Sequence, residues 1–167
     1  RVVTTHGHGD HWQALAAVVE ATSAETVAGA DDANDLPIAV DQPVRTGARI
    51  RVGSCELEVI EIVGHTPGSI VLAYDDPDGI THLFTGDSLF MPDGGTARCD
   101  FPGGSAATLY RSIQRMYAQP DDTRVFVCHD YGPGGRAMAC ETSIGEQKRA
   151  NIHVRDGISE SEFVAMR

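Results

Sequence analysis

Four potential metal ligands lie within a six-residue segment near the start of the sequence. They are His6, His8, Asp10 and His11. Imidazole nitrogens and carboxylate oxygens together bind divalent metals such as zinc and iron. In an extended segment, residues two apart point to the same side, so His6 and His8 can reach one ion. A carboxylate is also favoured near a helix N-terminus, so Asp10 is either a cap or a ligand, and its neighbours favour ligation.

Three further residues of the same ligand types each follow a short apolar run. His65 comes after residues 58–64, Asp87 after residues 82–86, and His129 after residues 125–128. Short apolar runs of this kind are typical of strands. Because all three positions come directly after predicted strands, we expect them to meet the N-terminal segment in one metal centre at the rim of a sheet.

The elements that must position these residues alternate between strands and helices. Apolar residues at Trp12, Leu15, Ala16 and Val19 have helical spacing and predict a helix over residues 11–21. Ser105 is a suitable N-cap for a helix that extends to Ala118. The other predicted elements are strands at 2–5, 26–28 and 125–128, a loop at 31–44, hairpins at 50–63 and 69–85, a helix at 141–151, and a last helix after the capping-box sequence 159–162.

Composition is that of one ordinary globular domain over residues 1–167. Apolar residues make up 41% of the chain and charged residues 22%. The net charge of −11 disfavours nucleic-acid binding, which needs a basic surface. No apolar stretch is as long as a membrane span. The four cysteines form no C-x-x-C pair, so we expect reduced thiols and a cytoplasmic location.

The seven candidate ligands resemble those of the metallo-β-lactamase superfamily. The segment from His6 to His11 matches its H-x-H-x-D-H signature, and its later ligands match His65, Asp87 and His129 in order. The resemblance implies an α/β (α+β) fold, the four-layer αβ/βα sandwich. Members of this family usually carry several strands before the signature, whereas five residues precede it here, so we expect the domain to lack N-terminal strands.

The resemblance also implies how the ligands are divided between two metals. In this family His6, His8 and His65 correspond to the ligands of one metal, Asp10, His11 and His129 to those of a second, and Asp87 to a bridge between them. A metal pair lowers the pKa of a bridging water and supplies hydroxide at neutral pH. This reading predicts a glyoxalase II-like hydrolase of a thioester or lactone, with two Zn(II) ions or a mixed Zn/Fe pair.

Residues 94–166 are more similar to one branch of the family, the persulfide dioxygenases. The similar segments are 95–101 (to G-R-T-D-F), 128–131 (to G-H-D-Y), 143–151 (to a helix ending in E-x-x-x-N) and 162–166 (to E-F-V-x-x-M). These enzymes bind one Fe(II) at the positions of His6, His65 and Asp87, a two-histidine, one-carboxylate set. Departures occur at Cys99, usually Thr, at Cys128, usually Gly, and in the glycine-rich segment 132–136.

Three hypotheses follow. The first is an Fe(II) enzyme that oxidises a small thiol persulfide, such as glutathione persulfide, to sulfite, with the catalytic residues His6, His65 and Asp87 as iron ligands. Asp10, the fourth candidate catalytic residue, belongs to the outer shell in this hypothesis. The second is the dinuclear hydrolase. The third is a truncated domain that binds metal or a partner without catalysis. The family resemblance also allows a homodimer.

Several other residues have both a functional and a structural interpretation. Arg98 could hold a substrate carboxylate through its planar fork or form a salt bridge with Asp100 or Asp87. Tyr131 could hydrogen-bond the substrate or pack at the rim. We expect Cys99 to be a buried structural thiol and His82 to be a strand residue with a hydrogen-bond partner. The sequence around His153 gives little indication of function.

Overall fold

Residues 1–167, described in a computed structural model, form two sheets that pack against each other. The smaller sheet is parallel, with strands β1 (Val2–Val3), β2 (Thr26–Gly29) and β3 (Gln42–Val44) in that order. Between β1 and β2 the chain forms the helices α1 (Gly9–Trp12) and α2 (Leu15–Thr22). Parallel neighbours need such a crossover, because a tight turn joins only antiparallel strands.

The larger sheet has six strands in sequence order. They are β4 (Arg49–Val52), β5 (Cys55–Glu61), β6 (Ile70–Asp75), β7 (Thr81–Phe84), β8 (Arg124–Phe126) and β9 (Glu141–Ser143). All neighbours are antiparallel except β7 and β8, which are parallel and joined through α3 (Ala106–Tyr117). Two further helices follow β9, namely α4 (Ile144–Ala150) and α5 (Glu160–Met166), and a short 3-10 turn, η1 (Pro133–Gly135), precedes it.

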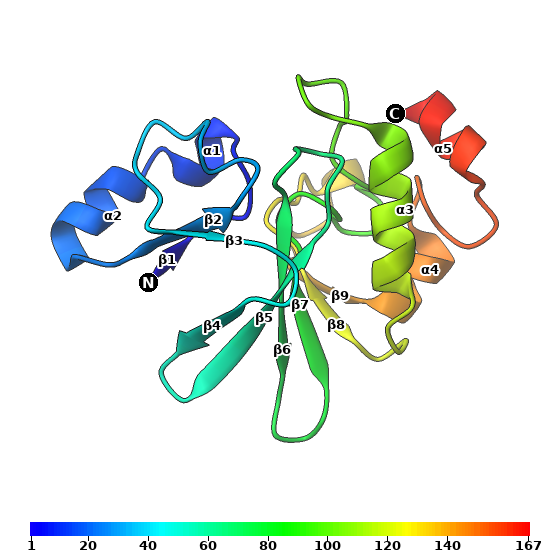
Figure 1. The fold of residues 1–167 in the computed structure, drawn as a ribbon. Coiled ribbons are helices and arrows are strands. Elements are labelled where there is room, and N and C mark those ends of the chain that lie inside the picture. Colours follow the sequence, from blue (N-terminus) through cyan, green and yellow to red (C-terminus); the bar gives the residue numbers. More distant parts are fainter.

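The layers follow from the alternation of side chains in the large sheet. Ile70 and Leu72 of β6 belong to an apolar cluster with Val27 of the small sheet, whereas Val71 belongs to the larger cluster that includes Leu109 and Phe163 from the helices. Successive strand residues point to opposite faces, so one face meets the small sheet and the other meets α3, α4 and α5. Figure 1 shows this order, with α1 and α2 beyond the small sheet. The predicted four-layer fold is confirmed.

Both predicted hairpins of the large sheet are confirmed, as are two capped helices. The hydroxyl of Ser105 accepts from the backbone N–H of Thr108 at the start of α3. Ser159 and Glu162 form a reciprocal capping box at the start of α5. These elements were predictable because they depend on local sequence features, namely turn residues, alternating apolar and polar side chains, and helix-capping residues.

The prediction of one continuous helix over residues 11–21 was wrong. Two short helices, α1 and α2, form instead and are separated at Gln13–Ala14. Only Leu15 of this region is buried. Trp12, which belongs to the apolar spacing of the predicted helix, is half-buried, and its indole N–H donates to the carbonyl of Gly7, 3.1 Å away. Trp12 thus fixes the backbone of the segment that carries the candidate ligands. The apolar residues of this region do not bury a full helical face.

Two other boundaries also differ from the sequence prediction. Residues 141–143, expected to start a helix, pair with β8 as strand β9, and Ser143 then caps α4. Residues 42–44, expected in a loop, form β3 against β2. Pro43 in this strand lies at the sheet edge, where a missing N–H is tolerated. The longest helix, α3, has 12 residues, and none of the helices meets the length and hydropathy of a membrane span.

Candidate metal centre and its pocket

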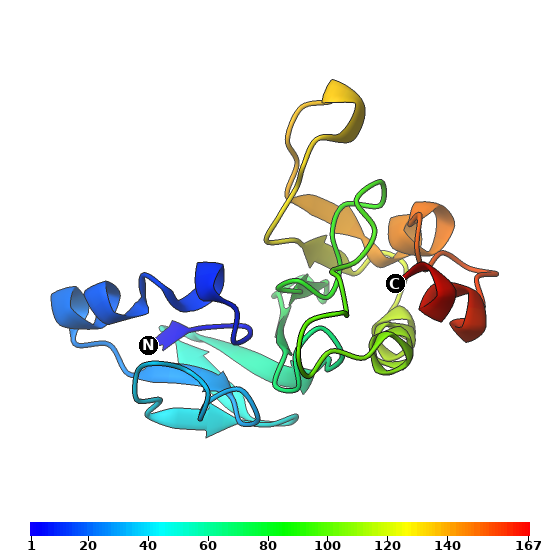
Figure 2. The same cartoon turned by 90° about the horizontal axis from the view of Figure 1, so that it is seen from above.

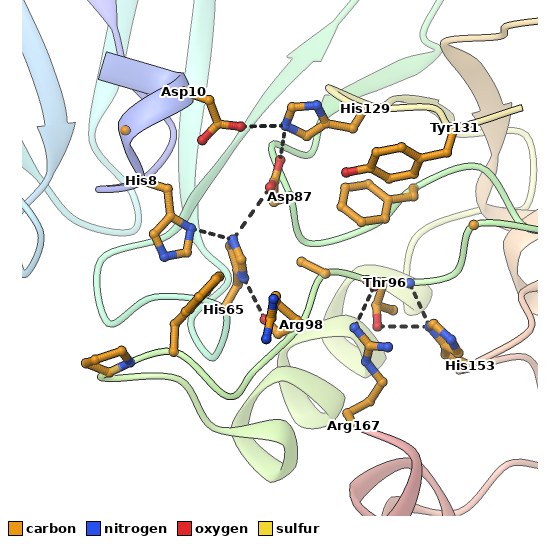
Figure 3. Close-up of a pocket in the computed structure, with 16 residues that line it drawn as sticks. His8, Asp10, His65, Asp87, Thr96, Arg98, His129, Tyr131, His153 and Arg167 are labelled. Carbon is orange, nitrogen blue, oxygen red and sulfur yellow. Dashed lines mark hydrogen bonds and ion pairs between the residues drawn. The ribbon is translucent and has the colours of Figure 1, made fainter. Parts of the chain in front are cut away.

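The seven predicted ligands converge at one edge of the two sheets. His6 lies beyond the end of β1, His65 beyond β5, Asp87 beyond β7, and His129 beyond β8. The other three lie in or beside α1, which starts directly after His8. Figure 3 shows His8, Asp10, His65, Asp87 and His129 around a common space. The predicted meeting of strand ends with the N-terminal segment is therefore observed.

Two glycines allow the chain to turn directly before a ligand. Gly64, before His65, has φ of +128°, and a Cβ there would lie 2.3 Å from the backbone nitrogen of Leu109. Gly86, before Asp87, has φ of +51°, and a Cβ would lie 2.8 Å from the hydroxyl of Thr5. Positive φ and such close approach both favour glycine. The glycines in G-H-T and T-G-D are therefore required by backbone geometry.

The ligand atoms form two groups, one on each side of Asp87. His6, His8 and His65 make one group, and Asp10, His11 and His129 make the other, with the potential ligand atoms of each within 4.8 Å of one another. The carboxylate of Asp87 lies between them. Its Oδ2 is 3.5 Å from His65 Nε2 and 3.8 Å from His6 Nε2. Its Oδ1 is 3.2 Å from His11 Nε2 and 3.4 Å from His129 Nε2.

Hydrogen bonds behind the ligands fix which nitrogen is free to bind. His65 Nδ1 lies 2.7 Å from the carbonyl oxygen of Arg98. Because a carbonyl oxygen can only accept, Nδ1 carries the proton and donates it. The lone pair of His65 therefore lies on Nε2, which faces the centre. Burial, together with the nearby His11, lowers the pKa of His6 to about 3 and keeps its imidazole neutral.

The charge of Asp87 is stabilised by the histidines around it. Burial alone would raise the pKa of Asp87, but the close imidazoles of His11, His65 and His6 outweigh burial and hold the pKa well below its usual value. Burial would lower the pKa of His11, but the nearby carboxylate of Asp87 outweighs burial and raises it. The centre thus has an ionised carboxylate surrounded by imidazoles.

The residues fit a bound metal ion. His6 Nε2 and Asp87 Oδ1 are buried and have no hydrogen-bond partner, although buried polar atoms almost always have one. The facing nitrogens of His8 and His65 are 2.9 Å apart, and those of His11 and His129 are 3.1 Å apart. Two nitrogens bound to one ion, at bond lengths of about 2.0–2.1 Å, are separated by roughly 3.0–3.4 Å. Both the donor types and their spacing suit zinc or iron.

Asp10 does not cap helix α1. Capping was the alternative to a role of Asp10 as a metal ligand. The residue before α1 is His8, and no side chain caps this helix. The Asp10 side chain is 57% exposed, and its Oδ2 is 3.3 Å from His129 Nε2. Asp10 therefore lies at the open side of the centre, whereas His6 and His65 lie at its buried side.

A buried carboxylate that the sequence analysis missed connects the two ligand-bearing loops. Asp32 is 4% exposed, and its Oδ2 accepts from the backbone N–H of Gly7 at 2.8 Å and from the hydroxyl of Thr66 at 2.6 Å. Its Oδ1 accepts from the N–H of Gly68 at 2.7 Å. Asp32 lies in an acidic stretch without local features that distinguish it from the exposed Asp31, so only the tertiary structure identifies it.

A pocket of about 710 Å³ opens beside the metal-binding residues. Arg98 and Tyr131, the predicted substrate residues, both line it. Tyr131 is 71% exposed at the rim. The guanidinium of Arg98 is bound to both carboxylate oxygens of Asp100, which is its predicted structural role, and lies 4.3 Å from the centre of the Phe101 ring. Two residues without a predicted role, His153 and Arg167, complete the opposite wall (Figure 3).

The segment after His129 reaches outward from the body of the molecule, as the view in Figure 2 shows. Asp130 fixes its base by accepting from the backbone N–H of Ala139 and from the guanidinium of Arg136. Arg136 also binds Asp93 on the neighbouring loop. This ion-pair network connects the loop of His129 to the loop that follows Asp87.

The remaining structural expectations are confirmed. Cys99 is buried, and burial raises the pKa of its thiol. His82 lies in β7, its Nε2 is 2.8 Å from the carboxylate of Asp76, and it belongs to none of the candidate ligand groups. All four cysteines are free thiols.

Comparison with known proteins places this site in a family. A family model described as Metallo-beta-lactamase superfamily matches residues 1–129. The Beta-lactamase hydrolase-like protein of Agrobacterium fabrum is 40% identical over 99% of this chain and 41% of its own length. A hydroxyacylglutathione hydrolase of Cereibacter sphaeroides is 35% identical over 84% of this chain and 52% of its own length. The crystal structure of ETHE1 from Myxococcus xanthus has a TM-score of 0.84 and 37% identity, and covers 99% of this chain and 66% of that one. The chain thus spans between 41% and 66% of the length of these proteins.

Proposed function

Because this chain belongs to the metallo-β-lactamase superfamily, we propose that it is a metal-dependent enzyme, and specifically an iron-dependent dioxygenase. Its proposed substrate is the persulfide of a low-molecular-weight thiol such as glutathione. The proposed ligands of the iron are His6, His65 and Asp87.

The observation that carries this proposal is the unequal burial of the seven candidate ligands. His6 and His65 are 1% and 3% exposed, and the side chain of Asp87 is 11% exposed, whereas that of Asp10 is 57% exposed. The side chain of His11 is also 11% exposed, but it faces the other carboxylate oxygen of Asp87. The two buried histidines and the Asp87 Oδ2 that faces them thus form a set of two histidines and one carboxylate, which is typical of non-haem Fe(II) sites that leave coordination positions open. A single iron on the buried side would leave His129 and Asp10 as outer groups.

The pocket wall adds support, because much of it comes from the dioxygenase-like half of the sequence. Thr96, Arg98 and Phe101 belong to the segment similar to G-R-T-D-F, and Tyr131 belongs to that similar to G-H-D-Y. Two apolar rings of the pocket lie beside the candidate ligands, Phe101 from the first of these segments and Phe90 from the loop after Asp87. Phe101 contacts the His8 ring edge-on at 5.1 Å, and Phe90 contacts that of His129 at 6.0 Å. The rings would shield the reacting sulfur from bulk water.

The proposed reaction consumes one dioxygen and one water for each persulfide. The sulfur–sulfur bond breaks, four electrons pass from sulfur to dioxygen, and the products are the thiol, sulfite and two protons. Iron, when bound, would supply a site where dioxygen and the terminal sulfur are activated together. The chain would contribute orientation, because the bond from His65 Nδ1 to the Arg98 carbonyl fixes the ring that presents Nε2.

Oxygen uptake tests the proposal. Protein reconstituted with Fe(II) should consume oxygen when glutathione persulfide is added, with one sulfite formed for each dioxygen. The His65→Ala variant should lose both iron and activity. A control variant, His82→Ala, removes a histidine that lies outside the centre and should keep both. No uptake by folded, iron-loaded protein would refute the dioxygenase.

A dinuclear hydrolase is the second candidate, supported by a different observation. Three potential ligands lie on each side of Asp87, and each of its carboxylate oxygens faces one group. The relative in Cereibacter sphaeroides is named a hydroxyacylglutathione hydrolase. Two bound metals would supply hydroxide for attack on a thioester.

The Asp10→Asn variant separates the two candidates. Asp10 belongs to the exposed ligand group alone. A hydrolase with two metals should bind only one metal in this variant and lose thioester hydrolysis. A dioxygenase with one iron should keep its iron and most of its oxygen uptake. Metal content per chain, measured by elemental analysis beside activity, distinguishes these outcomes.

A further inference from the structure

Arg136, in the glycine-rich segment 132–136, binds two carboxylates at once. Its guanidinium donates to both oxygens of Asp130, at 2.6 and 2.7 Å, and to both oxygens of Asp93. A further N–H donates to the carbonyl oxygen of Ala137 at 3.0 Å. All five N–H groups of the guanidinium therefore have an acceptor. Bidentate pairs of this kind fix the geometry of the groups they join, whereas most surface ion pairs do not.

The two carboxylates belong to loops that each carry a candidate metal ligand. Asp130 directly follows His129, and its side chain is only 4% exposed. Asp93 lies in the loop 87–95, which begins with Asp87. Asp87 Oδ1 lies 3.4 Å from His129 Nε2 across the centre. Apart from this contact between the ligands themselves, only the hydrogen bonds of Arg136 join the two loops.

Three aromatic rings of the pocket wall lie on the same two loops. Phe90 contacts the rings of His129 and Tyr131 edge-on, with ring centres 6.0 and 5.9 Å apart. The ring of Tyr131 stacks on that of His129 at 6.2 Å, and Figure 3 shows these two rings next to each other. All three side chains line the pocket. A shift of either loop would therefore separate the rings and move His129 relative to the carboxylate of Asp87.

The segment that carries Arg136 is not held in place by packing. It projects from the body of the molecule (Figure 2), and a Cβ on Gly134 or Gly135 would have no atom within 4 Å. Glycine-rich backbone also has many accessible conformations. At Gly132 the chain folds back on itself, because a Cβ there would lie 2.8 Å from the carbonyl oxygen of Arg136. This turn returns the guanidinium to the base of the segment, where the two carboxylates fix it.

We propose that Arg136 is a positioning residue of the metal centre, which holds His129 against Asp87 by binding Asp130 and Asp93 together. The inference rests on the proposed metal-dependent function but on neither candidate reaction. In the hydrolase His129 would be a metal ligand, and in the dioxygenase it would be an outer group that faces the ligand Asp87. In both cases the bridge fixes the distance between these two side chains.

Zinc affinity, measured by chelator competition, tests this role without any turnover. Groups that orient metal ligands change metal affinity about 10–100-fold, so Arg136→Gln should bind its most weakly held Zn(II) about tenfold or more weakly than the wild type. Arg45→Gln is the matched control, because Arg45 also bridges two carboxylates, those of Asp31 and Glu61, but lies outside the pocket. This control variant should bind Zn(II) as the wild type does.

The Asp93→Ala variant distinguishes a bridge from a purely structural role. The Asp93 side chain is 43% exposed, so this variant should fold and decides the question even if Arg136→Gln does not. If Arg136 acts as a bridge, Asp93→Ala should also weaken Zn(II) binding, and the double variant should bind no more weakly than Arg136→Gln alone. If Arg136 only neutralises the buried Asp130, Asp93→Ala should bind Zn(II) like the wild type, and this result would overturn the bridge.

Oxygen uptake and thioester hydrolysis, measured separately, keep this role distinct from the proposed function. Turnover together with unchanged Zn(II) affinity in Arg136→Gln and Asp93→Ala would retain the proposed function and overturn the role of Arg136. Weakened Zn(II) binding in both variants, in a protein without turnover, would retain that role and refute both candidate reactions. Wild-type protein that binds no metal would overturn both the proposed function and the role of Arg136.

Discussion

Replacing Asp32 with asparagine tests whether this buried carboxylate holds the metal-binding loops together. Its two oxygens accept from Gly7, which lies between His6 and His8, and from Thr66 and Gly68, which follow His65. Asparagine has nearly the same shape but only one accepting oxygen. If that oxygen keeps the bonds to Gly7 and Thr66, the amide NH₂ must face the N–H of Gly68, and two donors then oppose each other.

The expected cost follows from this one lost bond. A hydrogen bond to a charged acceptor contributes about 1.5–3 kcal/mol, and a buried donor without a partner costs about 1–3 kcal/mol. We therefore expect Asp32→Asn to lower the free energy of unfolding by about 2–3 kcal/mol. For a chain of this length the melting temperature should fall by roughly 4–12 °C. The substitution should also let the loop of His6 and His8 shift relative to the loop of His65. The affinity for Zn(II) or Fe(II) should therefore fall about tenfold or more.

Thermal melts followed by circular dichroism give the stability change, and chelator competition gives the metal affinity. Asp31→Asn is the matched control, because Asp31 is exposed and pairs with Arg45 at the surface. Surface pairs contribute only about 0–1 kcal/mol, and this variant should bind metal normally. If Asp32→Asn has the melting temperature and metal affinity of the control, Asp32 does not organise the centre.

Three further predictions concern backbone, metal and thiols. Gly64→Ala should prevent stable folding, because its Cβ would meet Leu109 at 2.3 Å. Gly47 also has a positive φ, but a Cβ there would have no atom within 4 Å. Gly47→Ala should therefore lower the free energy of unfolding by only about 1 kcal/mol. Thermal melts of the two variants distinguish the effect of the steric clash from that of the backbone strain. Zn(II) at about 1,000 times its dissociation constant should stabilise the apoprotein by about 4 kcal/mol, and calorimetry showing no shift would contradict a preformed site. Buried Cys99 should react with iodoacetamide much more slowly than exposed Cys140, and peptide mapping that finds equal rates would refute this order.

Local signals in the sequence predicted much of the fold. The hairpins of the large sheet, the caps at Ser105 and Ser159, and the strands before His65 and Asp87 all depend on neighbours within a few residues. Elements that depend on distant partners were predicted less well. Residues 141–143 are a strand only because β8 offers a free edge, and the first helix is broken where its segment serves the metal centre.

The sequence by itself determined the ligand types and their order, because metal chemistry limits which side chains can bind and strand ends limit where they can lie. Only the tertiary structure decided that Asp87 lies between two groups of ligands, with His6 enclosed and Asp10 open to solvent. It alone revealed Asp32, whose role depends on what lies opposite it in space, and it brought His153 and Arg167 into the pocket wall. Burial and contacts between distant segments are properties of packing, and no local pattern of residues encodes them.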